Sequence, residues 1–268
     1  MIKIAGGTYS TGSDRHYAEE RPVTARHVAG FLIDAYQVTN RDFVKFVAAT
    51  AYHTTAEQIG GSSVFKMTQG PVDLNNPDLW WQFVAGANWR HPDGPDSSLD
   101  GLDDHPVVHV SQQDAQAYAK WRGARLPDEW EWEVAARGGL AQADYVWGDD
   151  FSPDGQLQAN IWTGLFPWYF ARGPKPGTMP VGQYQPNGYG LYDMAGNVWE
   201  WTSSTFDHGA CCGPTSDAHD TRITVRGGSF LCAGEYCLRY RPAARIGVLP
   251  DATTNHIGFR CVRSVGAE

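Results

Sequence analysis

The residues best suited to chemistry are two cysteines, Cys232 and Cys237, in the segment SFLCAGEYCLRYRPAAR at 229–245. Five positions along a strand put two side chains on opposite faces, and five along a helix separate them by about 140°, so neither element brings the sulfurs together. A bend at the small residues Ala233 and Gly234 would do so. The spacing leaves three interpretations open: a local disulfide, two buried thiols, or two soft thiolate ligands that suit Cu(I).

Other patterns that could bind metal are weaker. No nearby His or Cys completes the three or four protein ligands that zinc uses. His105 and His109 have the i, i+4 spacing of a helical metal pair. Pro106 and the flanking valines favour extended chain, however, so we expect structural roles for both histidines.

The chain contains five cysteines, an odd number and a low density that argue against a disulfide-stapled fold. Cys211 and Cys212 are adjacent in a loop that contains Gly and Pro, where a strained disulfide between neighbours is disfavoured, and we expect both to be free. Cys261 follows GFR in a short apolar run and is expected to be a buried thiol.

Arginines and tryptophans are frequent around the cysteine pair. We expect the following arginines to partner carboxylates rather than to bind an anion: Arg239, Arg241, Arg245 and Arg260. The following tryptophans are expected in the core or in cavity walls: Trp80, Trp81, Trp89, Trp162, Trp199 and Trp201. Of these, Trp199 lies close enough in sequence to the other motifs to be a wall of a catalytic pocket.

Composition excludes several classes of protein. The 268 residues carry a formal net charge of −9 and a pI of about 5.4, which disfavours nucleic acid as a partner. No stretch approaches the roughly 18 apolar residues that span a bilayer, and the start lacks a basic segment followed by an apolar run. We expect a soluble, cytoplasmic, monomeric protein that does not bind membranes, with one domain over 1–268 because no repeat or linker marks a boundary.

Few regular elements are expected to position the site. Helices are predicted at 40–50 with Asn40 as cap, from Ser111 to Gly123, and from Pro127 to Gly138. Elsewhere, 30 glycines, 16 prolines and short apolar runs such as VVHV predict mixed α and β structure with long ordered loops.

The segment RGGSFLCAGEYCLRYRPAAR resembles the active-site region of the formylglycine-generating enzymes. Further blocks occur in the family's order over nearly the whole chain: YQVTNRDFVKFV, GANWRHPDGPDSS, DHPVVHVS, ARLPDEWEWEVAARGG, ANIWTGLFP, PNGYGLYDMAGNVWEWTSS and IGFRCV. The GNVWEW block also occurs in a wider superfamily, whereas GANWRHP and the cysteine pair are more specific. The resemblance implies a single α+β domain with little regular structure, often compared to the C-type lectin fold.

The resemblance also implies an activity: oxidation of a cysteine in a Cys-x-Pro-x-Arg segment of an unfolded sulfatase to formylglycine, with O2 and copper. Cys232 and Cys237 would hold Cu(I) in near-linear coordination, and the substrate cysteine would arrive as a third thiolate. O2 would then oxidise the copper, a hydrogen would leave the substrate Cβ, and the thioaldehyde would hydrolyse. Ser229 matches the family's active-site serine, although it is also suited to the turn after Gly228.

Two calcium sites follow from the resemblance. The side chains of Asp193 and Glu200, with the backbone carbonyls of Gly196 and Val198, match one ligand pattern of hard oxygens. The second pattern matches only at Asn160 and the backbone of Ile161.

The second calcium site has an altered partner segment, RGPKPGT. Gly173 and Lys175 stand near where the family has an Asp and an apolar residue. Because a lysine would repel the ion, we expect this second site to be unfilled.

Other departures from the family lie near the expected substrate. His256 stands where the family usually has Asn, and Ala233 where a polar residue usually follows the first cysteine. RIGVLPDATTN also differs from the more polar run typical after AAR. The metal chemistry would be kept while the accepted peptide differs, so a related copper-thiolate oxidase with another thiol substrate is the alternative hypothesis.

Two further classes of protein share this superfamily. A non-haem iron sulfoxide synthase would need a His triad, which the sequence does not show convincingly, and would not need the cysteine pair. A catalytically silent binding module should lack one or both cysteines. The presence of Cys232 and Cys237 favours the copper oxidase.

Overall fold

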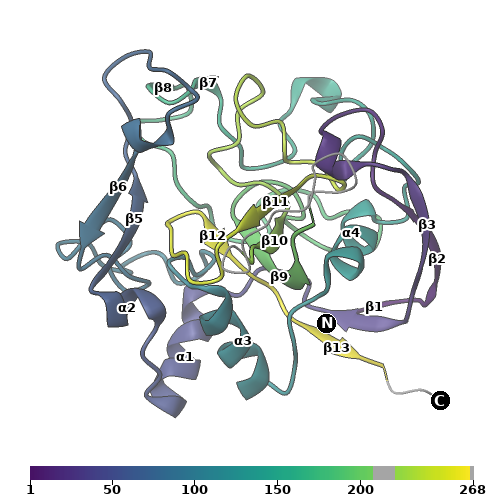
Figure 1. Ribbon diagram of the computed structural model, residues 1–268, viewed down its shortest axis with the longest axis horizontal. Coiled ribbons are helices and arrows are strands. Elements are labelled where there is room, and N and C mark those ends of the chain that lie inside the picture. The colour runs from purple at the N-terminus through teal and green to yellow at the C-terminus, as the bar shows by residue number, and fades with distance from the viewer. Residues whose placement is uncertain (208–220, 266–268) are drawn as a thin grey trace.

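The computed structural model describes residues 1–207 and 221–265. A four-stranded sheet lies at its centre (Figure 1), in the order β11 (Arg245–Val248), β10 (Ile223–Arg226), β9 (Trp199–Thr205) and β12 (Ile257–Gly258). Its pairs are antiparallel except β12 with β9, which is parallel.

Segments from the two ends of the chain meet in a second sheet. β4 (Phe31–Ile33) pairs antiparallel with β1 (Ile2–Ile4) on one side and β13 (Val262–Ser264) on the other. Three hairpins complete the strands: β2 (Gly7–Thr11) with β3 (Thr24–Val28), β5 (Gly61–Phe65) with β6 (Trp81–Ala85), and β7 (Gly164–Leu165) with β8 (Tyr169–Phe170).

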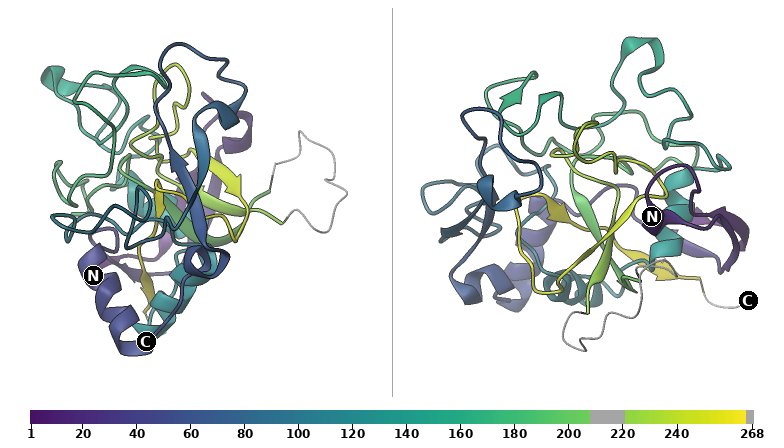
Figure 2. Two further views of the ribbon diagram at one scale, coloured as in Figure 1. Left: turned by 90° about the vertical axis from the view of Figure 1, so that its left-hand side faces the viewer. Right: turned by 45° about the horizontal axis from the view of Figure 1, so that its top comes forward.

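The helices are short, and loops account for much of the structure. They are α1 (Asn40–Thr50), α2 (Thr55–Ile59), α3 (Gln112–Trp121) and α4 (Glu129–Arg137), with 3-10 turns at Ala18–Glu20, Pro77–Leu79 and Pro153–Gly155. Figures 1 and 2 show α1 and α3 at one end of the molecule and the loops between α4 and β9 massed at the other. The expected α+β architecture with little regular structure is confirmed.

The three predicted helices are present, with corrections at their ends. Thr39, not Asn40, caps α1, because its hydroxyl accepts the Asp42 N–H. Asp128 caps α4 in a capping box with Glu131, so the helix begins beyond Pro127. Ser111 caps α3 as expected, although that helix ends at Trp121, before Gly123.

No helix in the described part of the chain is long and apolar enough to cross a membrane. The interior contains apolar clusters, in which Trp80, Trp89, Trp162, Trp199 and Trp201 are almost fully buried. This confirms the expectation for these tryptophans. Trp81 is half-buried and lies in a cavity wall.

Buried ion pairs fasten the loops to these elements. The four arginines named from the sequence each contact a carboxylate: Arg239 with Glu19, Arg241 with Glu20, Arg245 with Glu129 and Arg260 with Glu200. The prediction that they partner acidic residues is therefore confirmed. Glu133 on α4 is also buried, between Arg137 and Arg226 of β10.

Glu133→Ala should lower the free energy of unfolding by about 3–5 kcal/mol, because it leaves two buried guanidinium groups without their carboxylate. Chemical denaturation checks this. Lys45→Ala, which removes an exposed ion pair with Asp42, is the control and should leave the unfolding midpoint in place. Equal small effects of the two substitutions would contradict a stabilising role for the buried Glu133.

Candidate active site

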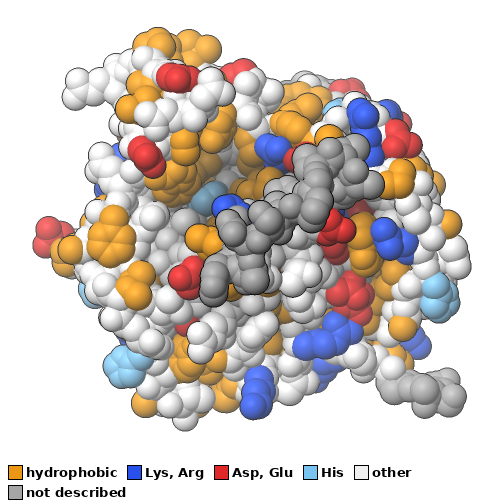
Figure 3. All heavy atoms as spheres, in the orientation of Figure 1, with side chains coloured by type: hydrophobic (Ala, Val, Ile, Leu, Met, Phe, Trp, Pro, Cys, Tyr) orange, Lys and Arg blue, Asp and Glu red, His pale blue; other side chains and the backbone are white. Residues whose placement is uncertain are grey.

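Both cysteines singled out from the sequence line one cavity of about 550 Å³. Figure 3 shows a hollow in this face of the molecule, where hydrophobic side chains gather. The cavity is lined by Ser63, Pro77, Trp80, Trp81, Phe166, Trp199, Arg222, Ser229, Leu231, Cys232, Tyr236, Cys237, Arg239, Ile246, Val248, Thr254, His256 and Ile257. The wall thus combines aromatic and aliphatic surface with two thiols, two serines, a threonine, a histidine and two arginines, as expected of a ligand pocket.

A tight turn brings Cys232 and Cys237 together. The N–H groups of Tyr236 and Cys237 both donate to the carbonyl of Ala233, at 3.1 and 2.6 Å. The two Sγ atoms lie 2.8 Å apart, and both cysteines are free. The bend expected at Ala233 and Gly234 is present, and the disulfide interpretation does not describe this structure.

Ser229 is placed by close packing of the chain before it. Gly228 has φ +71°, and a Cβ there would lie 2.9 Å from the Arg239 carbonyl oxygen. Glycine therefore lets the chain after β10 pass directly against the backbone at Arg239, two residues beyond Cys237. The Ser229 carbonyl accepts the Cys232 N–H at 2.9 Å, and its hydroxyl oxygen accepts the Leu231 N–H at 3.2 Å.

The two thiols differ in acidity. Burial raises the pKa of Cys232 well above its usual value. The pKa of Cys237 is lowered, first by the hydrogen bond from Cys232 and then by the nearby Arg239 guanidinium. We therefore assign Cys237 as the more acidic of the two thiols, the one that ionises first.

Arg239 has a second role that the sequence analysis missed. A carboxylate partner was expected, and the structure shows it to be Glu19, but Arg239 also favours the thiolate form of Cys237. Its guanidinium carbon lies 3.8 Å from the centre of the Tyr17 ring. The signal in the sequence is its position two residues after Cys237.

The sulfur pair suits a soft metal ion by its donor chemistry. Its separation of 2.8 Å exceeds the about 2.05 Å of a disulfide bond. A metal ion held in line between two sulfurs needs a larger sulfur–sulfur distance. With bonds of the zinc–sulfur length, about 2.3 Å each, that distance would be about 4.6 Å. The residues fit Cu(I) if one sulfur turns away from the other, and binding of the ion would displace the Cys232 proton.

His256 faces the same cavity, from the residue before β12. Its Nδ1 lies 2.7 Å from the Thr254 hydroxyl, and its ring packs against Trp81 at 4.7 Å. Burial, together with nearby His109, lowers the pKa of His256 to about 3, so the imidazole is neutral at neutral pH. The family departure noted in the sequence therefore changes a group that can contact a ligand.

Glu200, expected as a calcium ligand, is fully buried and already bonded on both oxygens. Oε1 accepts from Gln37 Nε2 at 3.0 Å and from Arg260 Nη2 at 2.8 Å. Oε2 accepts from Trp132 Nε1 at 2.7 Å and from Arg260 Nε at 2.8 Å. Arg260 thus balances the charge of this carboxylate.

Of the other expected ligands of the first calcium site, the Val198 carbonyl lies beside the same Gln37 amide, whereas the Asp193 side chain accepts the Gly182 N–H at 2.7 Å. Gln37 Nε2 is 3.3 Å from the carbonyl oxygens of both Asp193 and Val198, and the Gly196 carbonyl was the fourth expected ligand. Burial, with Glu200 nearby, raises the pKa of Asp193. No cluster of three or more His, Cys, Asp or Glu in the described ranges could hold a metal ion. The hard oxygens suit Ca²⁺ if the Gln37 amide turns aside, so this site stays a prediction.

The residues expected in the second calcium site, Asn160 and Ile161, contact an arginine instead. The guanidinium of Arg172 donates to the Asn160 Oδ1 at 2.6 Å and to the Ile161 carbonyl at 3.0 Å. A fixed cation already lies on both expected ligands, so the pair as arranged does not fit Ca²⁺.

The two histidines and the other cysteines named from the sequence do not line the thiol cavity where the structure describes them. His105 contacts Thr178 and His109 contacts Ser62, so the histidines share no ligand position, as expected. Cys261 is fully buried, as expected. The predictions for Cys211 and Cys212 concern residues outside the described ranges.

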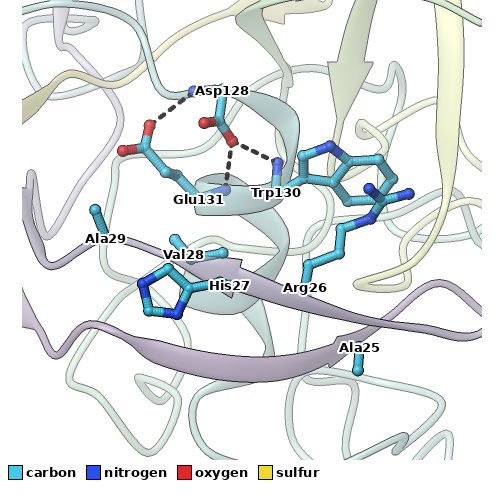
Figure 4. A pocket seen from close by; sticks show the side chains of 8 residues that line it. All are labelled: Ala25, Arg26, His27, Val28, Ala29, Asp128, Trp130 and Glu131. Carbon is cyan, nitrogen blue, oxygen red and sulfur yellow. Dashed lines mark hydrogen bonds between the residues drawn. The ribbon is translucent and has the colours of Figure 1, made fainter.

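A second cavity, of about 350 Å³, lies between β3 and the start of α4 (Figure 4). Its carboxylates cap the helix: Asp128 Oδ1 accepts the N–H groups of Trp130 and Glu131, and Glu131 accepts the Asp128 N–H. Arg26 stacks on Trp130 at 3.8 Å. These polar groups stabilise the helix end rather than form a reactive site.

Known proteins resemble this chain over its whole described length. The family model of the sulfatase-modifying factor enzyme 1-like domain matches residues 1–265. The chain belongs to this sulfatase-modifying factor family. The formylglycine-generating enzyme of Mycobacterium tuberculosis is 47% identical over 98% of this chain and 97% of its own.

The family also includes a relative named as inactive. The inactive C-alpha-formylglycine-generating enzyme 2 of Mus musculus is 41% identical, over 99% of this chain and 86% of its own. Among solved structures, PvdO from Pseudomonas aeruginosa has a TM-score of 0.66 at 24% identity, over 98% of this chain and 93% of that one. That likeness supports the fold alone.

Alkylation of Cys237 by iodoacetamide should have its pH midpoint below the usual thiol value of about 8.5, because the thiolate is the nucleophile and its pKa is lowered. Cys232→Ala removes the donated hydrogen bond and should raise this midpoint, and Arg239→Gln should raise it less. Mass spectrometry of labelled peptides follows both thiols. A wild-type midpoint at or above the usual value would contradict the assignment.

Calcium should raise the melting temperature of the protein if Asp193 and Glu200 bind it, because the ion would bind the folded chain only. The increase should disappear in Asp193→Ala and persist in Asp104→Ala, which changes an exposed carboxylate. Thermal scans with calcium and with chelator, alongside metal analysis, check this. Melting curves that chelator leaves unchanged, with no ion found, would rule the site out.

Proposed function

We propose that this protein oxidises a cysteine in a Cys-x-Pro-x-Arg segment of a sulfatase to Cα-formylglycine, using copper and O2. The observation that carries the proposal is the pair of free thiols, 2.8 Å apart, in the wall of a 550 Å³ cavity. Support also comes from formylglycine-generating enzymes that are 44–47% identical over nearly the full chain.

The reaction balances with a thiol reductant. The side chain of the substrate cysteine loses two electrons and two protons to become a thioaldehyde, and water then replaces sulfur, which leaves as hydrogen sulfide. Reduction of O2 to water takes four electrons, so two more come from two reductant thiols that join as a disulfide. Copper, when bound, supplies the redox chemistry, which protein side chains cannot provide.

The residues of the cavity have distinct tasks in this proposal. Cys237, the more acidic thiol, and Cys232 would hold the ion once both are deprotonated. Ser229 uses its oxygen to accept the Leu231 N–H, which leaves its O–H free to donate to substrate or oxygen. The aromatic wall, with Trp199 in it, excludes water from the reacting sulfur.

The alternative is a copper-thiolate oxidase with the same chemistry and another thiol or peptide substrate. His256 favours it, because a neutral imidazole lines the cavity beside the cysteines. Specificity depends on differences in transition-state binding, so a changed wall alters the accepted peptide before it alters the metal chemistry. With copper loaded, no turnover of a Cys-x-Pro-x-Arg peptide would favour this alternative.

Replacement of either thiolate tests the proposal directly. Reduced wild-type protein should bind one Cu(I) per chain, measured against a chromogenic Cu(I) competitor, and should convert a Cys-x-Pro-x-Arg peptide in the presence of O2. Cys232→Ser and Cys237→Ser should each lose most of the Cu(I) affinity and nearly all turnover, because a serine hydroxyl is a harder and largely protonated ligand.

Cys261→Ser is the matched control, since this thiol is buried away from the cavity, and it should keep both copper binding and turnover. Oxidation of the wild-type pair to a disulfide should abolish copper binding until a reductant is added. Tight one-to-one Cu(I) binding by the Cys232→Ser, Cys237→Ser double variant would overturn the assignment.

A further inference from the structure

The side chain of Arg172 joins two loops that lie next to the thiol cavity. Its Nη2 donates to the Asn160 Oδ1 at 2.6 Å and to the Ile161 carbonyl at 3.0 Å. Its Nη1 donates to the Tyr184 hydroxyl at 2.9 Å. One guanidinium therefore satisfies two oxygens of the kind that a hard cation would coordinate.

These two oxygens are not free for a divalent ion. The other side-chain atom of Asn160, Nδ2, donates to the Gly177 carbonyl and to Asn197 Oδ1, so both ends of the amide are fixed. Gly173 supplies no acidic ligand, and Lys175 pairs with Asp93 at 2.7 Å. A fixed positive charge at hydrogen-bond distance would repel Ca²⁺.

We propose that Arg172 replaces a divalent cation in this protein, as a built-in cross-link between the loop at Asn160 and Ile161 and the loop that carries Arg172. The guanidinium provides the same positive charge to the same oxygens, without dependence on dissolved metal. The cross-link is consequently present whatever the calcium concentration.

Two short hydrogen-bonded paths connect this cross-link to the thiol turn. Next to Ile161, the Trp162 N–H donates to the Cys232 carbonyl at 3.1 Å. The Asn160 carbonyl accepts the Asn197 N–H at 2.8 Å, and the Asn197 carbonyl accepts the Phe230 N–H at 3.0 Å. Arg172 is therefore a positioning residue for the backbone around Cys232. Only this link to the thiol turn rests on the proposed function.

The test exchanges the internal cation for a metal site. Arg172→Met removes the N–H donors and charge while keeping much of the aliphatic stem. Adding Gly173→Asp supplies the missing carboxylate, and a Cβ at Gly173 would meet no atom within 4 Å. The double variant should bind one more Ca²⁺ per chain than wild type by equilibrium dialysis, and calcium should raise its melting temperature by more than it raises that of wild type.

Arg172→Met alone should melt several degrees below wild type, with a loss that calcium does not restore. In this variant hydrogen exchange of the Trp162 N–H should also become faster, because this group follows the released Ile161 and donates to the Cys232 carbonyl. Lys175→Met is the matched control: it removes a neighbouring cation that contacts Asp93 and should change neither quantity.

Two results would overturn the proposal. One is loss of a bound Ca²⁺ from wild type on Asn160→Ala, which would show that the ion and not Arg172 occupies these oxygens. The other is an Arg172→Met protein with the melting temperature of wild type. That result would show that Arg172 does not act as a cross-link, whether or not the double variant folds. Calcium counting involves neither copper nor turnover, so its outcome is independent of whether the proposed oxidase activity holds.

Discussion

The fold depends above all on the buried ion pair between Glu200 and Arg260. Both side chains are fully buried, and the carboxylate is satisfied by two hydrogen bonds from the guanidinium, one from Trp132 and one from Gln37. Arg260 further donates to backbone carbonyls of the segments at 34–35 and 192. One pair of charges thus joins β9, α4, the chain before α1 and the C-terminal segment, and it is fully hydrogen-bonded, as burial of charge requires.

Ion pairs that join separate segments suit a chain with little regular structure. Short helices and two-residue strands cannot fix long loops by packing alone, so charged side chains reach across the interior to fix them. Arg241 with Glu20 and Arg239 with Glu19 tie the cysteine turn to the N-terminal segment in the same manner. Arg172 extends this pattern to the loop at Asn160 and Ile161, whose oxygens accept from its guanidinium.

The same kind of contact gives Cys232 and Cys237 different acidities. Two identical side chains acquire opposite pKa shifts because one is enclosed by apolar groups and the other accepts a hydrogen bond beside a guanidinium. The site therefore holds two thiols of unequal acidity, of which Cys237 is the more acidic. Since Arg239 is held by Glu19 and by Tyr17, the acidity of Cys237 depends on residues more than two hundred positions earlier in the chain.

The sequence by itself determined the chemistry that is available. Residue type alone makes Cys232 and Cys237 candidate soft ligands, and periodicity with capping residues located α1, α3 and α4 to within a few positions. The arginines were assigned to carboxylates because buried guanidinium groups require partners. These features are local, or follow from the chemical nature of one side chain.

Only the tertiary structure decided which partner each group has. Spacing could not tell a disulfide from a pair of free thiols, because that depends on the turn at Ala233 and on how the chain at Arg239 packs against Gly228. Nor could it place Arg172 on Asn160 and Ile161, or Gln37 among the oxygens around Glu200, since these contacts join loops whose paths no local pattern specifies. Ligand sets made by distant segments are a property of the folded chain, whereas the donors themselves are a property of the sequence.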